Sequence, residues 1–222
     1  MKGLNANYQI PDLNKKAFAR TNAQTISHRV VLLKELVPDV HAIAEICCGD
    51  SMQQYQAYIN RLGVSAYHCL DIEPKIVAAN KKRGIECHCG DALDEDLLKR
   101  FVLDDVLFFG PPLSTDCNGH QILQFADIRP GYCDFARILL AELNYSGMLV
   151  CICPNTTTMG DIAKLYHQIQ GFREGFNLRL IHHSYSTITG NGEKTEMRLK
   201  YIELWFSNQL DDLWEVRENK SL

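Results

Sequence analysis

The 222-residue sequence predicts an α/β fold: a doubly wound, mostly parallel, seven-stranded sheet with a C-terminal antiparallel hairpin and helices on both faces. Three observations predict it. Short apolar runs alternate with segments of helical periodicity, which is the order of parallel strands joined by crossover helices. These runs lack the polar alternation of a half-exposed strand, so they suit strands buried on both faces. The last two runs are joined by a loop too short for a crossover helix, so they pair antiparallel.

The length suits one substantial hydrophobic core, and we expect a single domain over residues 1–222. Val30, Leu33 and Val37 lie at helical spacing before Pro38 and predict a helix ahead of the first strand. The domain is therefore expected to consist of a polar N-terminal extension, a lead-in helix and a catalytic core, at residues 1–16, 17–37 and 42–208.

Each expected strand is followed by a helix until the last quarter of the chain. The strands expected to be parallel lie at residues 41–48, 65–74, 84–93, 104–112 and 147–154. The helices that follow them are expected at residues 52–62, 74–84, 94–101, 132–143 and 160–170. The final strands, 178–188 and 198–208, flank a polar loop with two glycines, which predicts a hairpin.

Composition and charge favour a cytoplasmic protein. The formal net charge is −4 and the isoelectric point is about 6.1, so the sequence lacks the basic excess typical of proteins that bind nucleic acid. A nucleic-acid partner is allowed but not favoured. No apolar run approaches the roughly 18 residues of a membrane span, and the N-terminus lacks a signal-peptide run, so no membrane partner is expected.

Nine cysteines raise the question of metal or disulfide chemistry. Most of them fall in or beside the apolar runs, where a free thiol behaves as a small hydrophobe. Cys87, His88 and Cys89 form the one metal-like cluster, but it lacks a second pair of ligands and falls on an expected strand. We therefore expect reduced core cysteines and no metal site.

A tight turn after the first strand and an acid after the second predict a cofactor site. Residues 45–51 read Glu-Ile-Cys-Cys-Gly-Asp-Ser, and Gly49 suits a sharp turn beside a helix N-terminus. Asp71 ends the second strand about 20 residues later, the spacing at which an acid in such folds contacts a ribose. The two features together predict an adenosine-type or dinucleotide-type cofactor.

The order of these segments resembles the class I S-adenosylmethionine-dependent methyltransferases. Their pattern is a D/E-x-G-x-G-x-G turn, an acid after the second strand, an acid after the third and a final antiparallel hairpin. The resemblance covers roughly residues 17–208 and implies S-adenosylmethionine as cofactor and methyl transfer as activity. Cys47 and Ser51 depart from it, because they stand where the family usually has its first and third glycines.

The same resemblance assigns roles to individual residues. Asp71 would contact the ribose, Asp91 would accept the adenine amino group, and Ile72 would lie against the adenine ring. The full set of expected cofactor-binding residues is Glu45, Cys47, Gly49, Asp71, Ile72, Asp91, Ala92 and Gly110.

Gly110, Pro111, Pro112 and Leu113 resemble the (D/N)-P-P-(Y/F) loop of methyltransferases that act on amino nitrogens. In that family the acid or amide and the first proline's carbonyl accept hydrogen bonds from the target amine, while the aromatic residue stacks on it. Gly110 has no acceptor and Leu113 cannot stack, so only Pro111 keeps a catalytic role here. The alternative, that the prolines merely end the strand, stays open.

The following loop supplies two candidates for a general base, Asp116 and His120. An Asx-type turn is an equally good explanation of its composition. The methyl acceptor is not identified: the acidic charge slightly favours a small molecule, and nucleic acid and protein stay open. Two alternative functions remain, an NAD-dependent oxidoreductase and a catalytically inactive methyltransferase-like binding module. The absent G-x-G-x-x-G motif and the final hairpin both argue against the oxidoreductase.

Overall fold

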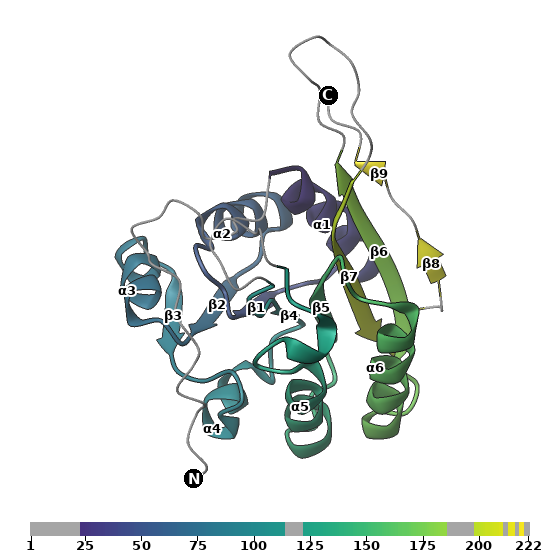
Figure 1. Ribbon diagram of the computed structural model, residues 1–222. Helices are drawn as coiled ribbons and strands as arrows, with labels where there is room; N and C mark the ends of the chain where they lie inside the picture. The colour runs from purple at the N-terminus through teal and green to yellow at the C-terminus, as the bar shows by residue number, and fades with distance from the viewer. Residues whose placement is uncertain (1–22, 114–121, 186–197, 211–212, 216–217, 220–222) are drawn as a thin grey trace.

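A computed structural model describes residues 23–113, 122–185, 198–210, 213–215 and 218–219. Its sheet has nine strands in the order β3-β2-β1-β4-β5-β7-β6-β8, and β9 pairs with β6. Figure 1 shows the sheet with helices on both sides, as the sequence predicts.

The first five strands are parallel to one another. They are β1 (Ala42–Ile46), β2 (Ala66–Asp71), β3 (Glu86–Cys89), β4 (Val106–Phe109) and β5 (Met148–Pro154). The hairpin of β6 (Asn177–Tyr185) and β7 (Arg198–Ser207) is antiparallel and inserts β7 next to β5. Two short strands that the sequence did not predict, β8 (Leu213–Glu215) and β9 (Glu218–Asn219), pair with the free side of β6.

Two layers of helices cover the sheet. The first layer comprises α1 (Ala23–Leu36), α2 (Met52–Ala57) with its π-helical continuation η1 (Tyr58–Leu62), and α3 (Pro74–Lys82). The second comprises α4 (Glu95–Leu98) with η2 (Lys99–Phe101), η3 (Phe125–Asp127), α5 (Tyr132–Ala136) with η4 (Arg137–Glu142), and α6 (Met159–Phe172). We call the two sides of the sheet the α1–α3 face and the α4–α6 face. The lead-in helix is confirmed over 23–36, and residues 17–22 lie outside the described residues.

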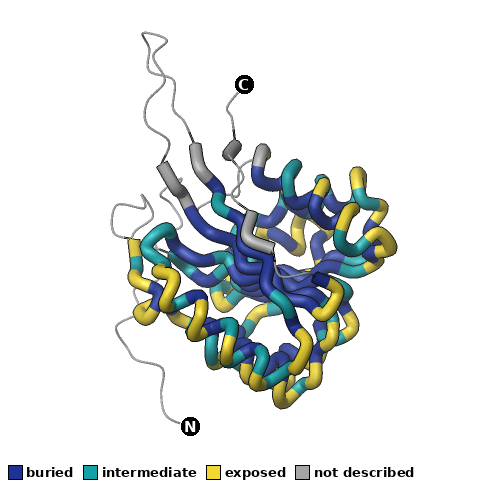
Figure 2. The backbone as a smooth tube through the Cα atoms, turned by 90° about the vertical axis from the view of Figure 1, so that its right-hand side faces the viewer, coloured by how far each residue is buried: buried dark blue, intermediate teal, exposed yellow. Residues whose placement is uncertain are grey.

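Each face has its own hydrophobic core because the strands are buried on both sides. On β1, Ile43 packs into the core of the α1–α3 face, whereas Ala44 and Ile46 pack into the core of the α4–α6 face. Figure 2 shows the strands buried between helices whose outer surfaces are exposed. Cys69, Cys87, Cys151 and Cys153 are buried in these cores, as expected for structural thiols. Among the described residues, no helix is both long enough and apolar enough to span a bilayer.

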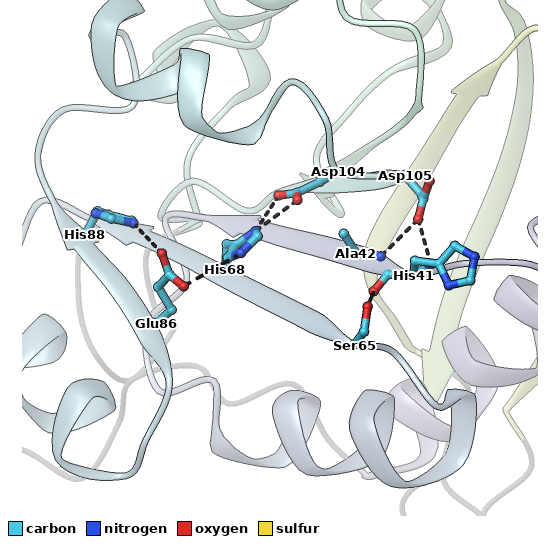
Figure 3. A network of polar contacts seen from close by, with 8 residues as sticks. All are labelled: His41, Ala42, Ser65, His68, Glu86, His88, Asp104 and Asp105. Carbon is cyan, nitrogen blue, oxygen red and sulfur yellow. Dashed lines mark hydrogen bonds and ion pairs between the residues drawn. The ribbon is translucent and has the colours of Figure 1, made fainter.

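Polar contacts fix the amino-terminal edge of the sheet (Figure 3). The Asp105 carboxylate accepts hydrogen bonds from the backbone N–H groups of His41 (2.6 Å) and Ala42 (2.9 Å), which ties the start of β1 to the start of β4. His68 Nδ1 lies 2.9 Å from Asp104 Oδ1 and links β2 to the same segment. The predicted cofactor residues lie at the opposite, carboxyl-terminal edge, where open α/β sheets bind their ligands.

Candidate cofactor-binding site

The segment between β1 and α2 is a sharp bend. Cys47 and Gly49 both adopt the left-handed backbone conformation, with φ of 59° and 56°. Glycine adopts this conformation without steric cost, whereas Cys47 adopts it despite its side chain. The backbone N–H of Cys48 donates to the Leu70 carbonyl at 3.2 Å, which holds the bend against the end of β2.

Gly49 is fixed by hydrogen bonds through both its N–H and its carbonyl. Its N–H donates to Asp71 Oδ2 at 2.9 Å, and its carbonyl accepts from Asn80 Nδ2 at 2.8 Å. The other Asp71 oxygen, Oδ1, accepts the N–H of Glu73 at 2.9 Å. Burial raises the pKa of Asp71 above its usual value, while these two N–H groups oppose the rise. The bend, the end of β2 and α3 therefore form one connected unit.

The carboxylates of Asp71 and Asp91 both lie near the bend. Burial first, and then the charges of Asp71 and Asp91, raise the pKa of the Cys47 thiol well above its usual value. Asp91 is half-buried after β3, and its Oδ1 accepts the N–H of Leu93 at 2.9 Å. The ends of β2 and β3 thus bring two acids to the bend that ends β1.

The surroundings leave room for a ligand beside these groups. A Cβ built on Gly49 would meet no heavy atom within 4 Å. Ile72, directly after Asp71, keeps 49% of its surface exposed, whereas Ala92, directly after Asp91, is buried. Ile72 thus presents an apolar surface to solvent directly after Asp71.

Ser51, at the third glycine position of the family pattern, points away from this space. It is fully buried, and its hydroxyl donates to the Cys48 carbonyl at 3.1 Å. Burial raises the pKa of Tyr67 on the α1–α3 face, and a hydrogen bond with Ser51 opposes the rise. The substitution of glycine by serine therefore places no atom against the ligand space.

Glu45 lies apart from the other predicted cofactor residues. It is 5% exposed and packs among Arg29, Tyr58 and Tyr67 on the α1–α3 face. Burial raises the pKa of its carboxyl, and the charge of Arg29 opposes this. Nothing in the described residues tests the predicted contact between Glu45 and the cofactor, so that contact stays a prediction.

A buried ionic cluster that lies near Glu45 was not predicted from the sequence. Arg29 Nε on α1 donates to Glu203 Oε1 on β7 at 2.7 Å, and Trp205 Nε1 donates to Glu203 Oε2 at 3.1 Å. His183 Nε2 lies 3.3 Å from the same oxygen. The available signal was a charged residue inside an apolar stripe: Arg29 on the lead-in helix, and Glu203 in the apolar run of the last strand.

The end of β4 lies next to the bend. The Gly110 N–H donates to the Ile46 carbonyl at 3.0 Å, so the double proline starts beside the last residue of β1. Pro111 is buried and Leu113 is half-buried. The Leu113 carbonyl accepts the Leu123 N–H at 2.9 Å across residues 114–121. Asp116 and His120 fall among those residues, outside the described part of the chain, so their roles stay predictions.

Asn80 is the site residue that sequence reasoning did not single out. It is 1% exposed on α3, on the same side as Ile76 and Val77, which are also buried. A polar residue at a core position of an amphipathic helix was the signal that could have found it, since buried polar groups are almost always hydrogen-bonded.

No protein-family model matches the sequence, and no curated protein sequence matches it. Solved structures do match the fold. A SAM-dependent methyltransferase from Agrobacterium tumefaciens aligns with a TM-score of 0.60 at 12% identity, over 85% of this chain and 63% of its own. Precorrin-6y C5,15-methyltransferase from Geobacter metallireducens aligns with a TM-score of 0.54 at 12% identity, over 87% and 91%.

A third structure, named precorrin 8w decarboxylase, from Methanobacterium thermoautotrophicum, aligns with a TM-score of 0.55 at 12% identity, over 86% and 92% of the two chains. At these identities the likeness concerns the fold, and the activity must be argued from the site. The sheet order, the final hairpin and these alignments agree: the chain has the fold of the class I S-adenosylmethionine-dependent methyltransferases.

Proposed function

We propose that this protein is an S-adenosylmethionine-dependent methyltransferase. The observation that carries the proposal is the meeting of three features at one edge of the sheet: the left-handed bend at Gly49, the Asp71 carboxylate bonded to it, and Asp91, whose charge acts on the Cys47 thiol. This is the arrangement expected for residues that hold an adenosine.

Asp71 is suited to hold the ribose. Each of its oxygens accepts one backbone N–H, from Gly49 or Glu73, and keeps a second lone pair for a ligand hydroxyl. The two N–H bonds fix the carboxylate before any ligand arrives, which lowers the entropic cost of binding. Ile72 would cover one adenine face, and Asp91 would accept the adenine amino group.

The acceptor is expected beside the end of β4. Bound S-adenosylmethionine supplies a methyl group on a positively charged sulfur, and the protein has mainly to align the acceptor with it. Gly110 and Pro111 border the bend through the bond from Gly110 to Ile46, so the Pro111 carbonyl is our candidate for orienting the acceptor. Asp116 and His120 are our candidates for removing a proton, where the acceptor must lose one. A small molecule is our first choice of acceptor.

Calorimetric titration with S-adenosylhomocysteine, the demethylated product, tests the cofactor site. We expect the Asp71→Asn variant to bind it about 10- to 100-fold more weakly, because a hydrogen bond to a charged group contributes about 1.5–3 kcal/mol. Asp96→Asn is the matched control, since Asp96 is an exposed carboxylate on α4 whose partner is Lys99.

Absence of binding by the folded wild-type protein would contradict the proposal. A rise in melting temperature with NAD but not with S-adenosylmethionine would instead favour an oxidoreductase. Binding without methyl transfer to any acceptor would favour the inactive binding module.

A further inference from the structure

The thiols of Cys48, Cys69 and Cys87 lie together on the α1–α3 face, next to the bend. Cys48 Sγ lies 4.0 Å from Cys87 Sγ, although the two residues are 39 positions apart in the chain. Cys69 on β2 is the register partner of Cys87 on β3. Cys48 belongs to the bend itself, between Cys47 and Gly49, whereas Cys69 and Cys87 are held in the sheet.

Asn80 connects this thiol cluster to the predicted cofactor site. Its Nδ2 group lies 3.6 Å from Cys48 Sγ and 4.0 Å from Cys87 Sγ, and it donates to the Gly49 carbonyl at 2.8 Å. Asn80 therefore connects the two sulfurs to Gly49, the residue whose N–H is bonded to Asp71.

The cluster contains both a nucleophile and an accessible thiol. Hydrogen bonds from Cys48 and Cys69 lower the pKa of Cys87 to about 3, with a further contribution from Asn80. Cys87 is buried, whereas Cys48 is half-buried and is the member that solvent reaches. Thiolates are the reactive form of cysteine, so Cys87 is the member suited to attack a disulfide formed on Cys48.

We propose that Cys48 and Cys87 form a reversible disulfide that releases the bend from Asp71. The disulfide site stands on the geometry of the thiol cluster alone. Its effect on cofactor affinity rests on the proposed function.

The oxidant that this chemistry needs is a low-molecular-weight disulfide of the glutathione class. Cys48 loses its proton to solvent and attacks one of the oxidant's sulfur atoms, which yields a mixed disulfide and one free thiolate. The Cys87 thiolate then attacks the Cys48 sulfur, which forms the internal disulfide and frees the second thiolate. The two cysteine sulfurs lose two electrons, and the two oxidant sulfurs gain them.

Closing the bond requires the bend to move. A disulfide has a sulfur–sulfur distance of about 2.05 Å, so the present 4.0 Å separation of Cys48 and Cys87 must shorten. Cys87 is held in β3 by its pairing with β2, whereas Cys48 lies outside regular strands. The shift therefore falls on Cys48 and its neighbour Gly49, and we expect the Gly49 N–H to leave Asp71.

The first test asks whether the disulfide forms. The folded full-length protein is treated with oxidised glutathione, and its intact mass and its peptides are measured. We expect a mass loss of two hydrogen atoms and a cross-linked peptide pair containing Cys48 and Cys87. Cys48→Ala and Cys87→Ala should abolish the cross-link, and Cys69→Ala should keep it. No cross-link, or one that contains Cys69, would overturn the proposal.

The second test asks whether the bond acts on the bend. Hydrogen–deuterium exchange of the peptide spanning residues 45–52 should become faster after oxidation and return to its original rate with dithiothreitol. S-adenosylhomocysteine should bind the oxidised protein at least ~10-fold more weakly. If the cross-linked protein shows unchanged hydrogen–deuterium exchange at residues 45–52, the proposal that the disulfide controls the bend is overturned. A reduced protein that binds no S-adenosylhomocysteine would instead refute the proposed function, and the cross-link and exchange data would still decide the disulfide.

Discussion

At the scale of single residues, a substitution at Gly49 distinguishes an effect on ligand binding from an effect on the stability of the fold. With φ of +56°, an alanine at this position meets no atom within 4 Å but adopts a left-handed conformation that costs L-residues about 1–2 kcal/mol. Gly84, at the turn after α3, has the same properties with φ of +83°. Unlike Gly84, Gly49 borders the predicted cofactor space.

We therefore expect Gly49→Ala and Gly84→Ala to lower the free energy of unfolding by similar amounts, about 1 kcal/mol each. Only Gly49→Ala should weaken S-adenosylhomocysteine binding, by at least ~10-fold, because its Cβ would occupy ligand space. Chemical denaturation measures the first quantity and calorimetry the second. Equal affinities of the two variants would show that the ligand does not approach Gly49.

At the scale of secondary-structure elements, the buried pair of Arg29 and Glu203 attaches α1 to the centre of the sheet. Arg29 is 1% exposed, Glu203 is fully buried, and the Arg29 guanidinium also lies 4.8 Å above the Phe108 ring. Burial alone would raise the pKa of Glu203, but the charges of Arg29 and His183 lower it well below its usual value.

Arg29→Met should lower the free energy of unfolding by about 3–5 kcal/mol, because it leaves a buried carboxylate without its main partner. Arg61→Met is the matched control: Arg61 also reaches α1, through a 2.8 Å bond to the Ser27 hydroxyl, but at an exposed position. We expect its effect to stay within about 0.5 kcal/mol. Urea titration measures both, and equal effects would show that the buried pair does not anchor α1.

The elements themselves were largely predictable. Hydrophobic periodicity and turn residues located the five parallel strands, the helices between them and the final hairpin, because these depend on the local sequence. The strands β8 and β9 were missed, since Leu213–Glu215 and Glu218–Asn219 are too short for a periodic signal.

At the scale of the whole molecule, a pH-dependent contact joins β2 to the segment before β4, across β1. The hydrogen bond from His68 to Asp104 raises the pKa of the imidazole, burial opposes it, and the charges of Asp104 and Glu86 add to it. A raised histidine pKa means that the folded state binds a proton more tightly than the unfolded chain does. The resulting stabilisation is present below the unfolded pKa of about 6.5 and is lost as the pH rises through the folded value.

Unfolding free energies measured from pH 5.5 to 9 should therefore show a decrease above about pH 6.5 that Asp104→Asn removes. The quantity to compare between the two proteins is the slope of the unfolding free energy against pH. The absolute stability also changes, because Asp104 is buried and its replacement alters packing. Glu86→Gln is the milder control, since that side chain is 63% exposed. A wild-type slope that persists in Asp104→Asn would assign the pH dependence to another group.

The sequence by itself determined the succession of elements, the bend at Gly49 and the two acids that follow β2 and β3. Each of these depends on residues close together in the chain: strand periodicity, turn chemistry, and the alternation of apolar runs with helices.

Only the tertiary structure decided which side chains meet. It placed Glu45 near Arg29, bonded the buried Asn80 to Gly49, and brought Cys48 to Cys87. These contacts depend on the order and register of strands far apart in the sequence, and on the face to which each side chain turns, which no local pattern encodes.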